Sequence, residues 1–247
     1  MKQWALRGLT ATLLIGLLGA ANLQAFELED GDTFVFLGDS ITQAGTSPHG
    51  YITLFELFCG VNGYEVEIVN AGISGHKSND MLARLEEDVL SHNPDWVSIS
   101  CGVNDVWHQF AFDSEGVPLE AYRENMTAIV EQCLEDDVDV VLLTATPIYE
   151  DLESRENQML AEYNAFLREL AGQHDDVVLC DVNQAFQEEL AKKRRDDRLL
   201  TTDGVHLNGR GNRIMARSII RALDPRPFEV RRANLRWELA GNMCRSQ

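Results

Sequence analysis

The sequence predicts a single three-layer α/β domain. Short apolar runs recur along the chain, and each has the length and composition of a buried strand. The segments between them carry apolar residues at steps of three and four, which predicts amphipathic helices. Strands that alternate with helices pair in parallel through right-handed crossovers, so we expect helices on both faces of one sheet.

The expected elements follow one another regularly. The predicted strands cover residues 33–37, 65–69, 96–100, 138–144 and 177–180. The predicted helices cover residues 51–61, 81–90, 119–134, 158–170 and 208–223. Residues 107–118 form a polar connection that contains glycine and proline, and we expect a loop there of the kind that often borders a site.

Residues 1–25 have the features of a secretory signal. Lys2 and Arg7 precede an apolar stretch that is short for a membrane span, and Ala25 is a small residue suited to cleavage. We therefore expect cleavage before Phe26 and a secreted or periplasmic protein. An uncleaved anchor or a lipid attachment is the alternative, and the lack of a cysteine directly after the apolar stretch counts against the lipid.

The rest of the chain is long enough for one domain, which we place at residues 26–224. The formal net charge of −19 becomes −21 when the signal is removed. Such an acidic surface repels nucleic acid and anionic lipid, so we expect no nucleic-acid partner and no stable membrane insertion. Residues 225–247 form a locally basic extension, which we expect to pack on the acidic surface.

Five widely spaced cysteines do not form the pattern of a disulfide scaffold. Cys101 and Cys180 end apolar runs, and we expect both to be buried. One disulfide stays open as an alternative. No paired Cys or His spacing predicts a metal site, so we expect neither a metal nor a cofactor.

Four short segments carry the residues suited to chemistry. Three follow predicted strands and one precedes the last helix. They are residues 38–40, 70–75, 102–105 and 203–206. Because the carboxyl ends of parallel strands share one edge of the sheet, we expect these segments to meet there.

The first and last of these segments predict nucleophilic catalysis. A serine hydroxyl is a weak nucleophile and needs an adjacent base, which in turn needs an orienting group. Asp203 and His206 are three residues apart, so the carboxylate can accept from one imidazole nitrogen while the other faces Ser40. Asp39 and Ser40 also suit the cap of a helix, which is the simpler interpretation of that turn.

Attack on an ester carbonyl creates an oxyanion, which needs fixed N–H donors. Gly75 can bring its backbone N–H close because it lacks a side chain. Asn104 can supply a side-chain N–H, and the backbone N–H of Ser40 a third donor. Gly72 lies in the same segment as Gly75 and is the alternative there.

Together these segments resemble the GDSL, or SGNH, hydrolase family, named for a serine, a glycine, an asparagine and a histidine in separate blocks. Ser40, Gly75, Asn104 and His206 match the four blocks in order, although Ile41 stands where the family name has leucine. The resemblance implies a flavodoxin-like fold with a five-stranded parallel sheet. It also implies a serine ester hydrolase without a metal, with Asp203 in the triad and Asp39 holding the nucleophile loop. The family's donor glycine follows a small residue just before the next helix, which favours Gly75 over Gly72.

Trp107 and His108, which follow Asn104 closely, are candidates for lining the substrate pocket. Trp107 and His108 could line the acyl or alcohol side, and ordinary loop packing is the alternative. We expect Asp105 to cap a helix rather than to act in catalysis.

The sequence therefore predicts an exported carboxylic-ester hydrolase that acts through an acyl-enzyme. We expect short acyl groups, such as acetyl esters of carbohydrates. The alternatives are a lysophospholipase or long-chain esterase, an O-acyltransferase, and a non-catalytic glycan-binding domain.

Overall fold

The computed structural model describes residues 28–111, 115–192 and 199–223. The expected signal at residues 1–25 and the expected basic extension at residues 225–247 lie outside these ranges. Their predicted boundaries therefore stay predictions.

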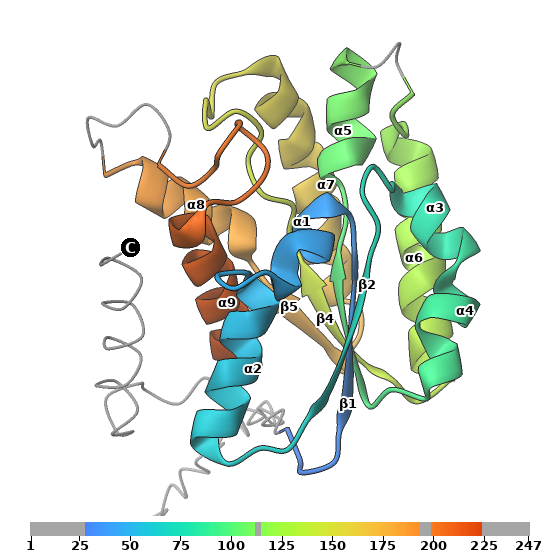
Figure 1. Cartoon of the computed structure of the whole chain (residues 1–247). Helices are drawn as coiled ribbons and strands as arrows, with labels where there is room; N and C mark the ends of the chain where they lie inside the picture. The colour runs from blue at the N-terminus through green and yellow to red at the C-terminus, as the bar shows by residue number, and fades with distance from the viewer. Residues whose placement is uncertain (1–27, 112–114, 193–198, 224–247) are drawn as a thin grey trace, which may run out of the picture.

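Five parallel strands form one sheet in the order β2-β1-β3-β4-β5 (Figure 1). The strands are β1 (Thr33–Gly38), β2 (Glu67–Gly72), β3 (Trp96–Ser100), β4 (Asp139–Leu143) and β5 (Val177–Cys180). This arrangement confirms the predicted five-stranded parallel sheet. The second strand begins and ends later than expected, so Gly72 lies within β2 and pairs with Gly38.

Helices cover both faces of the sheet and confirm the three layers (Figure 1). One layer contains α2 (Tyr51–Asn62), α8 (Val182–Leu190) and α9 (Gly209–Leu223). The other contains α3 (Ser78–Ala83), α4 (Leu85–Asp88), α6 (Leu119–Glu135) and α7 (Arg155–Ala171). The short helices α1 (Ser40–Gln43) and α5 (Val103–Phe110) follow directly after β1 and β3. None of the helices in the described ranges is long and apolar enough to cross a bilayer.

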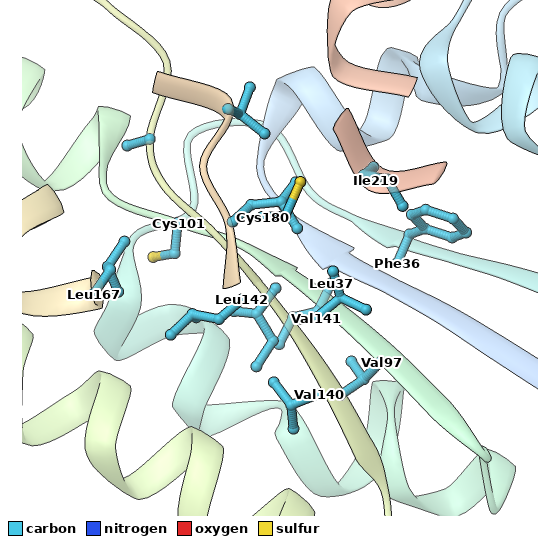
Figure 2. Close-up of a cluster of buried hydrophobic side chains, with 14 of the residues drawn as sticks. Phe36, Leu37, Val97, Cys101, Val140, Val141, Leu142, Leu167, Cys180 and Ile219 are labelled. Carbon is cyan, nitrogen blue, oxygen red and sulfur yellow. The ribbon is translucent and has the colours of Figure 1, made fainter. Parts of the chain in front are cut away.

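The core sits between the sheet and these layers. The central strands β1, β3 and β4 bury side chains on both faces, which is why they are almost continuously apolar in sequence. Phe36 of β1 and Ile219 of α9 belong to one buried cluster, which Figure 2 shows together with Val140 and Leu142 of β4. Phe34 and Phe36 stack at a centroid distance of 4.7 Å, and such aromatic contacts add to the area that each ring buries.

The prediction of one continuous helix over residues 81–90 is wrong, because this segment is broken into shorter elements. It consists of α3, α4 and the 3-10 turn η2 (Leu90–His92), with breaks that begin at Arg84. The Arg84 guanidinium donates to the carbonyl of Gly38 at 2.9 Å and to Nδ1 of His76 at 3.1 Å, so this side chain is held by tertiary contacts.

Two other helices were not expected. Residues 107–110 complete α5 instead of beginning a loop, and α8 occupies a segment for which no element was predicted. Asp181 caps α8 by accepting from the backbone N–H of Gln184 at 3.1 Å.

The cysteines of the described ranges are buried free thiols: Cys59, Cys101, Cys133 and Cys180. The predicted burial of Cys101 and Cys180 is confirmed, and no disulfide joins any two of these four. Burial raises the pKa of Cys59 and Cys133 to about 12.

One carboxylate, that of Glu150, holds the connection between β4 and α7 to residues 199–201, which precede α9. Glu150 accepts from the backbone N–H groups of Leu199, Leu200 and Thr201 at 2.7 to 2.9 Å, and from the Thr201 hydroxyl at 2.6 Å. Burial raises the pKa of Glu150, but these hydrogen bonds outweigh it and lower the pKa below its usual value. Glu150 thus holds residues 199–201, which do not belong to the five-stranded sheet.

Replacing Glu150 with Ala should lower the free energy of unfolding by about 1–3 kcal/mol, because several donors lose a charged acceptor at once. Glu150→Gln should lose less, since its side-chain oxygen can still accept. Chemical denaturation at pH 7 measures both. Glu153 is exposed on the same connection, and Glu153→Ala is the matched control. Equal losses for Glu150→Ala and Glu153→Ala would contradict the assignment.

Candidate active site

Ser40 stands at the carboxyl end of β1, on a tight turn into α1. The turn needs glycine at position 38, because a Cβ there would lie 2.0 Å from Oγ1 of Thr42. Asp39 is the N-cap of α1 and accepts from the backbone N–H of Ile41 at 2.9 Å. The expected helix cap and the expected nucleophile position therefore coexist in the same turn.

The structure brings the three predicted triad residues together. Nε2 of His206 lies 2.9 Å from Oγ of Ser40, although the two residues are 166 positions apart. Nδ1 of His206 lies 2.6 Å from Oδ2 of Asp203. The other oxygen of Asp203 accepts from the backbone N–H groups of Val205 and His206, which fixes the carboxylate next to Nδ1 of the ring.

The protonation states follow from the Asp203 carboxylate. Burial raises the pKa of Asp203, but hydrogen bonds from the His206 ring and from the two backbone N–H groups outweigh it and lower the pKa to about 2. At neutral pH this carboxylate is ionised and can only accept. Nδ1 of His206 must then carry the ring proton, which leaves Nε2 as the acceptor for the Ser40 hydroxyl.

Gly75 lies in the turn after β2, and Asn104 lies in the first turn of α5, after β3. Gly75 has φ +80°, a conformation that favours glycine, and its N–H meets no protein acceptor in the described part of the chain. Nδ2 of Asn104 donates to the carbonyl of His76 at 3.0 Å and lies 3.5 Å from Oδ2 of Asp39. The Asn104 side chain thus spans the turns that carry Ser40 and Gly75.

Gly72, the alternative to Gly75, has a different environment. Its N–H donates to Oδ1 of Asn70 at 2.9 Å. A Cβ at position 72 would lie 2.2 Å from the backbone nitrogen of Gln43, so glycine is needed there for close packing against the end of α1. Asn70 also donates to the carbonyl of Thr42 at 3.0 Å, so its side chain joins the end of β2 to α1.

Two buried carboxylates lie beneath the site. Burial raises the pKa of Asp39 to about 6, and the nearby Asp105 adds to this rise. Asp105 accepts from the backbone N–H of Ser78 at 3.0 Å and from its hydroxyl at 2.6 Å. Asp105 is the third residue of α5 and not the N-cap of that helix, but its carboxylate accepts from the first backbone N–H of α3 and so caps α3 from α5.

Trp107 and Tyr149 form an aromatic pair next to the loop that carries Asp203 and His206. Nε1 of Trp107 donates to the Tyr149 hydroxyl at 2.5 Å, and the rings meet edge to face at 6.3 Å. The backbone N–H of Tyr149 donates to the carbonyl of Gly204, between Asp203 and His206. His108 is half-buried next to Trp107, with a ring distance of 5.8 Å.

Sequence reasoning missed Tyr149 and Glu150 because no motif marks them. Both have φ +61°, which is uncommon for residues with a side chain. The only local signal is their position after Pro147, at the end of the fourth predicted strand. Among the described residues, no group of three or more His, Cys, Asp or Glu is arranged to hold a metal ion.

Comparison with known proteins gives several relatives of similar length. An acetylxylan esterase of Geobacillus stearothermophilus is 30% identical over 213 residues, which cover 80% of this chain and 96% of that protein. Its crystal structure superposes with a TM-score of 0.73 at 28% identity, over 80% of this chain and 96% of that chain. The crystal structure of an acetyl xylan esterase named AlAXEase superposes with a TM-score of 0.71 at 34% identity, over 77% of this chain and 99% of that chain.

Residues 36–214 match the model of the GDSL-like lipase/acylhydrolase family. The matched region runs from β1 into α9 and includes all four blocks on which the resemblance was based. The predicted resemblance is thereby confirmed, and the chain belongs to the GDSL-like lipase/acylhydrolase family.

Proposed function

We propose that the protein is an exported carboxylic-ester hydrolase that removes acetyl groups from carbohydrates through an acyl-enzyme. The observation that carries the proposal is the hydrogen-bonded series Ser40–His206–Asp203, with Asn104 and Gly75 beside it. Export rests on residues 1–25 alone, and the intact mass of the exported chain tests it.

In the acylation step, Oγ of Ser40 attacks the carbonyl carbon of the ester. Nε2 of His206 takes the hydroxyl proton as the new C–O bond forms, and Asp203 stabilises the resulting imidazolium through Nδ1–H. The imidazolium then gives its proton to the oxygen of the leaving alcohol. The bond to that alcohol breaks, and the acyl group stays on Ser40.

In the second step, water replaces the alcohol. His206 accepts a proton from water as the water oxygen attacks the acyl carbon, and the same proton returns to Oγ of Ser40 when the acid leaves. The ring can serve both steps because Asp203 holds it in one orientation, with two backbone N–H groups fixing the carboxylate in turn.

Both steps place negative charge on the former carbonyl oxygen. The backbone N–H groups of Ser40 and Gly75 and the side-chain amide of Asn104 are the proposed donors. The Gly75 N–H meets no acceptor within the described protein, so it can turn to the substrate without breaking a bond. Asp39 and the carbonyl of His76 hold the Asn104 amide close to its working position.

The substrate class rests on the relatives and on the surroundings of the triad. Both relatives described above are named as acetylxylan esterases. The side chains of His206 and Asp203 are 38% and 53% exposed, so a bulky alcohol can approach the triad from solvent. A neutral sugar ester also suits a chain with a formal net charge of −19 better than an anionic lipid does.

Ser40→Ala should abolish release of acetate from an acetylated xylo-oligosaccharide and labelling by a fluorophosphonate probe, because both require the hydroxyl. The melting temperature should stay within a few degrees of the wild type. Ser91→Ala is the matched control, because Ser91 is an exposed serine in η2, outside the four motif segments. Full activity of Ser40→Ala would refute the nucleophile, and wild-type preference for long-chain p-nitrophenyl esters would refute the acetyl substrate.

Asn104→Ala should lower kcat on the same substrate by about 10²–10³-fold with a small change in KM, because the lost donor acts mainly on the transition state. Asn79→Ala removes an exposed amide from α3 and should leave kcat unchanged. A loss of less than about threefold in Asn104→Ala would show that the oxyanion is held elsewhere.

The raised pKa of Asp39 predicts a pH-dependent stability. Between the unfolded pKa of 3.8 and the folded pKa of about 6, the folded state holds a proton that the unfolded state has lost, so stability falls as pH rises. From pH 5 to pH 7.5 the wild type should lose about 1 kcal/mol of unfolding free energy relative to Asp39→Asn. Urea denaturation at the two pH values measures this, and parallel changes in both proteins would contradict it.

A further inference from the structure

The Trp107–Tyr149 pair lies against the loop that carries Asp203 and His206. We propose that these two rings form a platform for the sugar ring that carries the acyl group. This inference rests on the proposed function and adds the residues that would recognise the carbohydrate part of the ester.

The position of the pair links the two halves of the site. Trp107 is three residues after Asn104 on α5, so both lie on the same side of that helix. The Tyr149 backbone donates to the carbonyl of Gly204 at 2.7 Å. A Cβ added to Gly204 would lie 2.7 Å from the Tyr149 ring, which places that ring against the loop of the catalytic Asp and His. The pair therefore joins the oxyanion side to the acid–base side.

The two rings are held in fixed positions. The 2.5 Å hydrogen bond from Nε1 of Trp107 to the Tyr149 hydroxyl and the edge-to-face contact restrict both side chains. A side chain that is already ordered loses little conformational freedom when a ligand binds, so such a pair gives more affinity than two mobile surface rings.

The backbone beneath Tyr149 is strained, and a specific contact compensates for the strain. Tyr149 and Glu150 are consecutive residues at φ +61°, a conformation that is unfavourable for bulky side chains. The Glu150 carboxylate, with its hydrogen bonds to Leu199, Leu200 and Thr201, holds this turn in place. Strain of this kind clusters at ligand-binding positions, where the side chain must be presented in one direction.

The exposed chemistry of the pair suits a neutral sugar. Tyr149 is 46% exposed, so a large part of its ring surface is open to solvent. An aromatic surface with a few fixed polar atoms is typical of small-ligand sites. The Tyr149 oxygen accepts from Trp107, and the described residues offer no acceptor for its own proton, so that O–H can donate to a sugar hydroxyl.

The test compares two acetyl esters, one with a sugar and one without a ring. The kcat/KM for an acetylated xylo-oligosaccharide and for ethyl acetate is measured for Trp107→Leu, Tyr149→Leu and Tyr149→Phe. Both leucine variants should lose at least about tenfold more kcat/KM on the sugar ester than on ethyl acetate, mainly through KM. Tyr149→Phe keeps the ring and should lose about threefold more.

Tyr64→Phe is the matched control, because Tyr64 lies before β2 at the opposite edge of the sheet, and its two rates should equal those of the wild type. Equal losses on both esters, or no loss on either, would overturn the platform while leaving the hydrolase intact. A wild type that hydrolyses ethyl acetate but not the sugar ester would overturn both the carbohydrate substrate and the platform.

Discussion

The close approach of two backbones at the end of β1 determines where the reacting groups can stand. Gly38 lets the chain turn against Thr42, and Gly72 lets β2 touch the backbone of Gln43. A side chain at either position would collide with its neighbour and push β2 away from α1. The loop after β2 begins directly at that contact and carries Gly75 three residues further on, so the positions of the proposed nucleophile and of one proposed oxyanion donor are set together.

The helices that follow β1, β2 and β3 at the site are joined by two buried carboxylates. Asp39 and Asp105 are both buried, and burial raises the pKa of each. Each binds backbone or hydroxyl donors, and together they connect α1, α3 and α5. Buried polar networks of this kind specify one arrangement, because a shift of any member leaves a charged group without its partner.

The sheet was predictable because its central strands are apolar on both faces, and β3 and β5 have the predicted bounds. The four motif blocks could also be recognised in the sequence. The fold places Ser40 next to His206, as predicted from these blocks. The break in the helix at Arg84 could not be predicted, since it accompanies a hydrogen bond from the Arg84 guanidinium to the distant carbonyl of Gly38. Tyr149 and Glu150 were missed for a similar reason: their backbone conformation is held by residues some fifty positions away.

The buried thiols have a consequence for the environments in which the protein can fold. Burial raises the pKa of Cys59 and Cys133 to about 12, and only the thiolate reacts readily, so both stay unreactive thiols in the folded protein. No bridge has to form among the four described cysteines, and none of them is exposed to an oxidant. The part of the domain that the structure describes therefore holds its fold without a disulfide, in reducing or in oxidising surroundings.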